Sequence, residues 1–259
     1  MTAPTSGAVA AAVAEDWRVL AGAHPNGWFH IQPGAFAAVS GNQLPPLNTV
    51  GAIGSGPQPE TVGALLDEVA ATGLAHSLQV RPGAATALGE LARERGMVRG
   101  DSTALMVLDD PAVLDDPPPV AESPAELTIR RLEPAEARTA AGVMAAGFGL
   151  PEEPFAQMMA PQLLGCEGLR CYVGEVDGEP VVTALGLRVG EHVGVFHIAT
   201  VPTARRRRYG AAMTARAIAD GREAGAAWAY LQSGAGGRPL FERLGFRSLE
   251  DWDIWIAIP

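Results

Sequence analysis

Strand and helix patterns alternate along the second half of the chain, and this alternation restricts the fold more than any other feature. Short apolar runs are typical of strands, and apolar residues at helical spacing are typical of helices. The expected strands are 127–132, 169–175, 180–189, 192–201, 227–232 and 252–258, and the expected helices begin near residues 133, 151, 204 and 239. This order predicts an α/β fold of the mixed α+β kind, in which helices flank a mixed β-sheet.

An acidic, proline-rich segment interrupts the chain before this region. Asp109–Ala125 reads DDPAVLDDPPPVAESPA and has no periodic apolar face. Proline removes backbone donors and restricts φ, so the segment is expected to be extended. We therefore predict a first domain over residues 1–110, a linker over 111–125 and a second domain over 126–259.

The first domain ends with a pattern that is similar to the end of the second. The sequence AHSLQV at 75–80 resembles AYLQS at 229–233, and LARERGM at 91–97 resembles LFERLGF at 240–246. A strand–helix–glycine–strand ending that occurs twice indicates a duplicated unit, so we expect two tandem copies of one fold.

Composition excludes several classes of protein. The net charge of −10 disfavours nucleic acid as a partner and weakly favours cationic substrates. The two cysteines, Cys166 and Cys171, match no common zinc spacing and cannot form a disulfide framework, so no metal is expected. Because no apolar run is long enough to span a membrane and no basic signal segment is recognisable, the expected location is the cytoplasm.

An arginine run stands where a strand gives way to a helix. The sequence from Ile198 to Ala212 reads IATVPTARRRRYGAA: an apolar strand stops at Pro202, basic residues follow, and small residues open a helix. The first N–H groups of a helix lack internal partners, and the helix dipole favours an anion there. This layout predicts a phosphate-binding site; a basic surface stretch or nucleic-acid patch is the alternative reading.

The same residues resemble the cofactor motif of the GNAT superfamily of acyl-CoA N-acyltransferases, Arg/Gln-x-x-Gly-x-Gly/Ala preceded by Val-x-Pro. Arg205 matches the first position and Gly210 the last, whereas Arg208 stands where the family has its middle glycine. The resemblance implies acetyl-CoA as co-substrate, with its pyrophosphate at the loop and its pantetheine arm along Ala199 and Val201. The implied cofactor residues are Ala199, Val201, Arg205, Arg206, Arg207, Arg208, Tyr209, Gly210 and Ala211.

A second block, from Pro239 to Phe246, resembles the closing motif of that family, in which a short helix carries a tyrosine. Here the corresponding residue is Phe241, which cannot donate a proton to the leaving thiolate. The first half of the chain has no comparable cofactor motif, and its Gly51–Pro57 stretch is typical of a turn. We therefore expect the first domain to be a degenerate copy that binds no cofactor.

Candidate bases for the acceptor amine lie on the expected strands: Glu175, Glu191, His192 and His197. His197 lies on the strand that should flank the acyl group, and a histidine titrates near neutrality, so it is the predicted catalytic residue; a structural role is the alternative. Tyr172 and Tyr230 are further possible proton donors.

The sequence thus predicts an N-acetyltransferase that transfers an acetyl group from acetyl-CoA to an amine of a small molecule or peptide by direct attack. The alternative is a catalytically weak regulatory module that binds acyl-CoA. The expected partners are acetyl-CoA and an amine-bearing substrate, with neither nucleic acid nor membrane, and the expected assembly is a monomer or homodimer.

Overall fold

The structure, a computed structural model, describes residues 3–258, and these residues form two compact units. The first contains the described residues up to Leu105 together with Ser233–Gly236 and the described residues from Ser248 onward. The second contains Met106–Gln232 and Gly237–Arg247. None of the helices formed by residues 3–258 is both long and apolar enough to cross a membrane.

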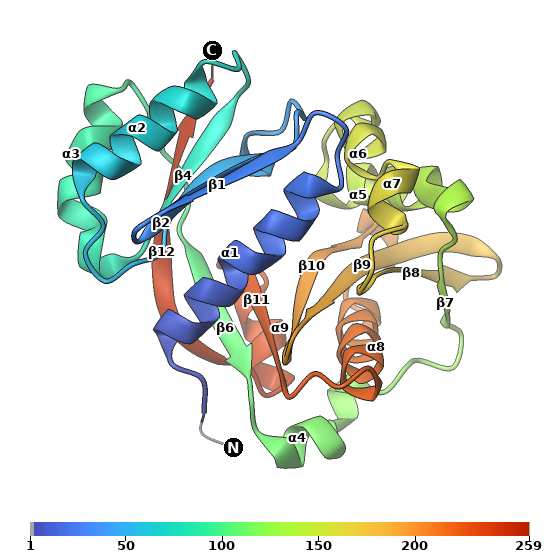
Figure 1. Cartoon of the computed structure of the whole chain (residues 1–259). Helices are drawn as coiled ribbons and strands as arrows, with labels where there is room; N and C mark the ends of the chain where they lie inside the picture. Colours follow the sequence, from blue (N-terminus) through green and yellow to red (C-terminus); the bar gives the residue numbers. More distant parts are fainter. Residues whose placement is uncertain (1–2, 259) are drawn as a thin grey trace. The chain divides into compact units, whose positions relative to one another are not determined.

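The second unit is built on five strands and the helices that pack on them (Figure 1). The strand order is β11-β10-β9-β8-β7, with β10 and β11 parallel and the other neighbours antiparallel. The elements are β7 (Thr128–Arg131), α5 (Ala137–Phe148), α6 (Glu152–Met158), α7 (Pro161–Leu164), β8 (Leu169–Val176), β9 (Glu179–Val189), β10 (His192–Thr200), α8 (Tyr209–Glu223), β11 (Trp228–Ser233) and α9 (Arg238–Arg243). A mixed sheet flanked by helices is therefore confirmed.

Small residues let α8 lie close to the sheet. A Cβ atom added at Gly221 would lie 2.8 Å from Cβ of Val193, and one added at Gly186 would lie 3.2 Å from Cβ of Ala217. The first of these contacts leaves no room for a side chain without a shift of the neighbouring strand, and the second is tighter than most Cβ contacts. Helices α5 and α6 lie on the other side of these strands in Figure 1, so the strands are covered on both faces.

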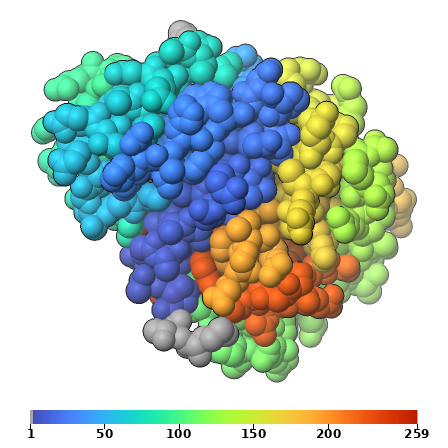
Figure 2. Space-filling view, viewed as in Figure 1, coloured from blue at the N-terminus to red at the C-terminus, as the bar shows by residue number. Residues whose placement is uncertain are grey.

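The strands of the first unit follow the order β1-β2-β3-β4-β12. Its elements are α1 (Ser6–Gly22), β1 (Trp28–Gln32), β2 (Ala35–Val39), β3 (Asn48–Ala52), α2 (Pro59–Ala70), β4 (His76–Val80), α3 (Ala85–Glu94), β5 (Val98–Arg99) and β12 (Arg247–Ala257); the unit boundary falls within β6 (Thr103–Leu108). The helices α2 and α3 cover one core, which includes Val50, Leu78 and Trp255. Helix α1 covers a second core around Phe36 and forms part of the outer surface in Figure 2.

The two units share one topology, as the repeated sequence pattern predicts. In the first, β1, β2 and β3 are successive antiparallel strands, and α2 connects β3 to the parallel strand β4. In the second, β8, β9 and β10 are likewise antiparallel, and α8 connects β10 to the parallel strand β11. Each unit therefore contains an antiparallel meander followed by a parallel crossover.

The division of the chain is less simple than a single linker. A cut at residues 111–125 assigns the last strand to the second domain, whereas β12 pairs with β4, from Asp253 opposite Val80 to Ala257 opposite His76. The residues of the expected extended linker also contain a helical segment, α4 (Pro111–Asp115), and a turn of 3₁₀ helix at Pro119–Ala121. Asp110 caps α4 by accepting a hydrogen bond from the N–H group of Ala112 at 2.9 Å.

Two expected helix boundaries are wrong for local reasons. The helix expected to begin near residue 151 is divided into α6 and α7, because Pro161 cannot continue the hydrogen-bond ladder. The helix expected from Ala204 begins at Tyr209, since Pro202–Ala204 forms a separate 3₁₀ turn and Arg206 and Arg208 have positive φ. The strands β8 and β9 are joined by a tight turn at Asp177-Gly178, where φ is 52° and 82°.

Candidate active site

Strands β10 and β11 pair over only part of their length. The register runs from His192 opposite Trp228 to Gly194 opposite Tyr230 and then stops, although β10 continues to Thr200. Beyond Gly194, the edge of β10 that faces β11 has no strand partner among residues 3–258. An unpaired strand edge presents N–H and C=O groups that an extended ligand can bind.

A β-bulge lies on this unpaired stretch. On β9, Leu185 and Thr183 are two residues apart, but their partners on β10 are Phe196 and Ala199, which are three apart. The additional residue is accommodated where His197 has φ of 50°, in the left-handed region that residues other than glycine adopt uncommonly. Strain of this kind is held by the surrounding structure and is common at functional sites.

The His197 side chain is half-buried and makes no hydrogen bond with any described residue. Burial lowers the pKa of this imidazole from 6.5 to about 4, because removal from water disfavours the charged form. The ring is therefore neutral at physiological pH and retains a nitrogen lone pair that can accept a proton.

The arginine loop, which we define as residues 205–211, connects β10 to α8. Arg206 and Arg208 have φ of 66° and 64°, and Arg208 is the N-cap of α8. The motif has a glycine where this chain has Arg208, and Arg208 adopts the left-handed conformation that glycine adopts most readily. The substitution therefore preserves the backbone shape that glycine would give.

The backbone N–H groups from Arg206 to Ala211 have no hydrogen-bond acceptor within residues 3–258. The first hydrogen bond of α8 is made by the N–H group of Ala212, which donates to the carbonyl oxygen of Arg208 at 3.0 Å. Left-handed residues before a helix and the free N–H groups of its first turn together form an anion-binding surface.

The four arginine side chains serve different purposes. Arg205 donates from Nε to the carbonyl oxygen of Thr200 at 3.3 Å and from a terminal nitrogen to that of Gly147 at 2.6 Å. Arg208 donates to the carbonyl oxygen of Pro119 at 3.0 Å. Arg206 and Arg207 are exposed and make no hydrogen bond or ion pair with the described residues. Two guanidinium groups thus brace the loop, and two are available to a ligand.

The small residues after the run lie where the motif requires them. A Cβ atom added at Gly210 would be 3.6 Å from Leu240 and 3.7 Å from both Ile198 and Thr200, which are ordinary contact distances. The fold alone does not demand a glycine here, so the absence of a side chain leaves space beside the end of β10. The Tyr209 side chain is buried and its hydroxyl donates to Glu126 at 3.0 Å, which makes it an anchor of α8.

Most of the other candidate bases and acids are occupied in structural contacts. Glu175 accepts from Arg130 at 2.9 Å, and Tyr172 donates to Asp220 at 2.8 Å. Burial, together with the Asp220 carboxylate, raises the pKa of Tyr172. His192 is buried with its ring against Trp228, whereas Glu191 is exposed beyond the end of the strand.

Two further residues bear on the chemistry. Phe241 is buried, and its ring packs edge-on against that of Phe246, with 6.0 Å between the ring centroids. The residue that corresponds to the tyrosine of the motif is therefore part of the core in this protein. Burial raises the pKa of the Cys171 thiol to about 12, which keeps it protonated and poorly nucleophilic. No group of His, Cys, Asp and Glu residues within residues 3–258 is arranged to hold a metal ion.

The structure brings His197, Ala199 and the arginine loop together at one end of β10. Sequence reasoning missed three features there: the bulge at His197, the contact of Arg205 with Gly147, and the contact of Arg208 with Pro119. The arginine run itself was the available signal for the loop, but nothing in the sequence pairs its members with those carbonyl groups.

Comparison with known proteins agrees with this arrangement. Residues 142–246 match the model of the acetyltransferase (GNAT) family. A GCN5-related N-acetyltransferase from Kribbella flavida is similar over 97% of this chain and 95% of its own, with a TM-score of 0.69 and 19% identity. A GCN5-related N-acetyltransferase from Sphaerobacter thermophilus is similar over 86% of this chain and 76% of its own, with a TM-score of 0.60 and 18% identity.

A tandem GNAT protein from the clavulanic acid biosynthesis pathway is similar over 90% of this chain and 84% of its own, with a TM-score of 0.58 and 12% identity. No curated protein matches the sequence. At these identities, the solved structures show the fold, and the family model identifies residues 142–246. Residues 142–246 thus match the acetyltransferase (GNAT) family, and the chain has the fold of the similar GNAT structures.

Proposed function

We propose that this protein is an N-acetyltransferase that transfers the acetyl group of acetyl-CoA to a primary amine of a small molecule or peptide. The observation that carries the proposal is the run of unpaired backbone N–H groups from Arg206 to Ala211, directly after the strand whose edge is unpaired. The pair of features fits a ligand with a pyrophosphate at one end and an extended amide chain at the other, as in CoA.

The residues present support the fit of such a ligand. The N–H groups of the arginine loop would receive the pyrophosphate, and Arg206 and Arg207 would add positive charge beside it. The pantetheine arm would follow the free edge of β10 near Ala199. The N–H group of Val201, the other residue expected to bind the arm, donates instead to the carbonyl oxygen of Val181 at 2.9 Å. The absence of a side chain at Gly210 leaves room for the phosphate oxygens to approach the helix N-terminus.

The proposed reaction is direct attack of the amine nitrogen on the thioester carbonyl carbon. A C–N bond forms, the C–S bond breaks, and CoA leaves as a thiolate. Backbone N–H groups near Ala199 would stabilise the negative charge on the carbonyl oxygen. The pKa of Cys171, about 12, argues against an acyl-cysteine intermediate.

Proton transfer would be handled at both ends of the reaction. His197, neutral and without a hydrogen-bond partner among the described residues, would accept the proton that the amine loses. Since Phe241 cannot donate, the thiolate would be protonated by water, which is feasible because a thiolate is only a mild base.

A catalytically weak module that binds acyl-CoA is the competing function, and the apolar contacts of Phe241 favour it. The two are separated by measuring CoA release from acetyl-CoA over a panel of small amines, amino acids and peptide N-termini. Release that depends on one class of amine supports the enzyme. Binding of acetyl-CoA without release over the whole panel supports the module.

We further propose that the first unit binds no cofactor. The register of β3 with β4 continues to Ala52 opposite Val80, the last residue of β3, so no free edge opens as it does in β10. The loop after β3 is covered as well, because Ile53 and Gly54 both donate to the carbonyl oxygen of Gly34. A Cβ atom added at Gly54 would lie 2.8 Å from Cα of Gly34, so its glycine serves packing.

Native mass spectrometry with acetyl-CoA tests this stoichiometry: one bound molecule per chain is expected, and two would contradict it. The protein is further proposed to act in the cytoplasm as a monomer or homodimer, without nucleic acid or membrane. Light scattering that shows a stable larger oligomer would contradict the assembly.

A further inference from the structure

The acidic, proline-rich segment lies along helix α8 and contacts it at three polar points. We call residues 115–126 the strap. At one end, Asp115 accepts from Arg222 at 2.5 Å; further along, the carbonyl oxygen of Pro119 accepts from Arg208 at 3.0 Å. Beyond it, Glu126 accepts from the hydroxyl of Tyr209 at 3.0 Å. From Asp115 to Pro119 the strap therefore runs antiparallel to α8, from the end of the helix toward its start, and Glu126 remains beside that start.

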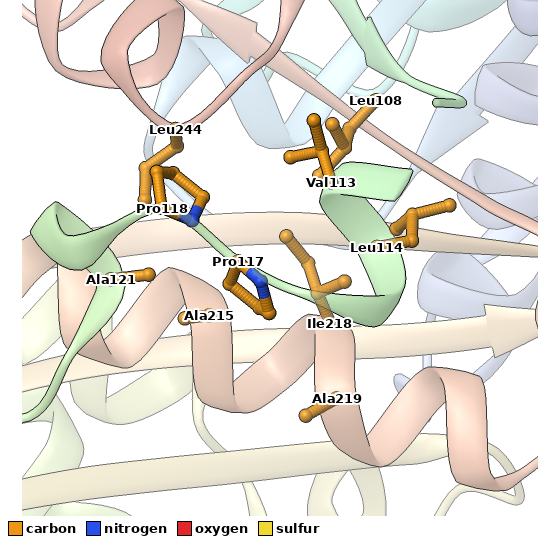
Figure 3. A pocket seen from close by; sticks show the side chains of 10 residues that line it. All are labelled: Leu108, Val113, Leu114, Pro117, Pro118, Ala121, Ala215, Ile218, Ala219 and Leu244. Carbon is orange, nitrogen blue, oxygen red and sulfur yellow. The ribbon is translucent and has the colours of Figure 1, made fainter. Parts of the chain in front are cut away.

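Apolar contacts join the strap to α8 between these polar points. Figure 3 shows Pro117, Pro118 and Ala121 beside the α8 residues Ala215, Ile218 and Ala219, around a pocket that Leu244 closes on another side. Proline restricts the backbone of the strap in advance, so little conformational entropy is lost when it packs on the helix. The segment expected to be an extended linker is instead packed on a helix of the second unit.

Arg208 connects this strap to the arginine loop. A residue other than glycine costs about 1–2 kcal/mol in the left-handed region, so a glycine would give the same backbone shape with less strain. What the arginine adds is its side chain, which donates to Pro119 from the N-cap of α8. The same residue therefore fixes both the backbone of the loop and the position of the strap.

We propose that Arg208 is a positioning residue, which acts by fastening the strap to the start of α8 and so holds the arginine loop in its anion-binding shape before the cofactor arrives. This inference rests on the proposed acyl-CoA site. A loop that is already ordered loses less entropy on binding, and the gain appears as affinity for the cofactor.

The test compares two ways of loosening the strap in the full-length protein. One variant replaces its prolines (Pro117→Gly/Pro118→Gly/Pro119→Gly), the second is Arg208→Gly, and the third combines both. The Kd for acetyl-CoA, measured by calorimetry, is expected to rise about tenfold in each, and by little more in the combined variant, because both changes loosen the same strap. Pro45→Gly/Pro46→Gly, in the first unit, is the matched control and should leave the Kd unchanged.

Hydrogen exchange without cofactor provides the second readout. The N–H groups of Ala121 and Glu122 donate to Pro118 and Pro119 within the strap, and they should exchange faster in Arg208→Gly than in the wild type. Arg208→Lys keeps the positive charge and so distinguishes a role in contacting the phosphate from a role in holding the strap. If its affinity for acetyl-CoA equalled that of the wild type while the strap N–H groups still exchanged as fast as in Arg208→Gly, the positioning role would be overturned. Additive losses in the combined variant would overturn it too, whereas absence of acetyl-CoA binding by the wild type would refute the proposed function itself.

Discussion

The guanidinium group of Arg205 donates a hydrogen bond to the carbonyl oxygen of Gly147 at 2.6 Å, and this bond joins the arginine loop to the end of helix α5. Gly147 is itself pressed against β10, since a Cβ atom added there would lie 2.9 Å from Cβ of Ala199. The end of α5, the end of β10 and the start of α8 are therefore held together at the proposed cofactor site.

Arg205→Ala should weaken acetyl-CoA binding without preventing folding. It removes hydrogen bonds from a charged donor to two carbonyl groups, each of which stabilises a structure by about 1–3 kcal/mol. Because the side chain is exposed, we expect the lower end, which corresponds to a rise of about tenfold in Kd. Arg131→Ala removes an exposed arginine on β7 and is the control; an equal loss in both variants would contradict the account.

Arg206→Gly should change stability and binding in opposite directions. The left-handed conformation of Arg206, with φ of 66°, costs an arginine about 1–2 kcal/mol that a glycine avoids. Thermal unfolding should therefore occur at a higher temperature, by a few degrees. Acetyl-CoA binding should weaken by about threefold to tenfold and depend less on salt, because a positive charge near the phosphates is lost. A variant that binds as tightly as the wild type would show that Arg206 does not face the cofactor.

His197→Asn should slow the reaction while keeping the bulge, because asparagine tolerates positive φ better than most residues. A base with a pKa of about 4 is a weak proton acceptor, so the expected loss in kcat is about tenfold to hundredfold. For the wild type, kcat/KM should rise with pH as the acceptor amine loses its proton and show no inflection near 6.5. An inflection near 6.5 that disappears in the variant would contradict the lowered pKa.

The same residue makes stability depend on pH. The pKa of His197 is about 4 in the folded protein and 6.5 when unperturbed, so between these values the unfolded chain binds more protons. The free energy of unfolding should therefore fall as pH decreases from about 6.5 to 4. In His197→Asn this fall should be smaller, as urea unfolding at several pH values would show. An identical pH dependence in both proteins would mean that His197 is not buried in this way.

The sequence predicted the elements well where pattern and turn chemistry agree. The strands from Leu169 to Thr200 are found at the expected positions, and the Asp177-Gly178 pair between two of them forms the tight turn that this pair favours. The start of α8 was misplaced because small residues at 204 and 210–212 suggest one continuous helix, whereas the loop needs two residues with positive φ. Helix propensity describes how readily each residue adopts a helix, and it does not reveal that these residues form a loop with positive φ.

The site was less predictable than the fold. The arginine run indicates where the loop lies. Which of its arginines bind the protein and which remain exposed depends on the carbonyl groups of Gly147 and Pro119, which are far away in sequence. The bulge at His197 is a one-residue difference in register between β9 and β10, and apolar alternation does not reveal it. Which residues bind acetyl-CoA remains a prediction.

Cys171→Ala should leave turnover unchanged within about twofold. The thiol is buried, its pKa is about 12, and direct attack requires no acyl-enzyme. The loss of a small buried side chain should lower the free energy of unfolding by about 1 kcal/mol. The check is the rate of CoA release, together with mass spectrometry of the wild type after incubation with acetyl-CoA. Loss of activity with an acetylated Cys171 peptide in the wild type would establish a covalent route instead.

Calorimetric titration of acetyl-CoA into the wild type, Gly210→Glu and Gly142→Glu tests the central claim most directly. A glutamate at Gly210 would place a side chain and a negative charge at the start of α8, whereas a Cβ atom at Gly142 on α5 meets nothing within 4 Å. We predict one equivalent bound by the wild type and by Gly142→Glu, and no binding by Gly210→Glu. Undiminished binding by Gly210→Glu, or no binding by the wild type, would contradict the assignment of the arginine loop as the cofactor site.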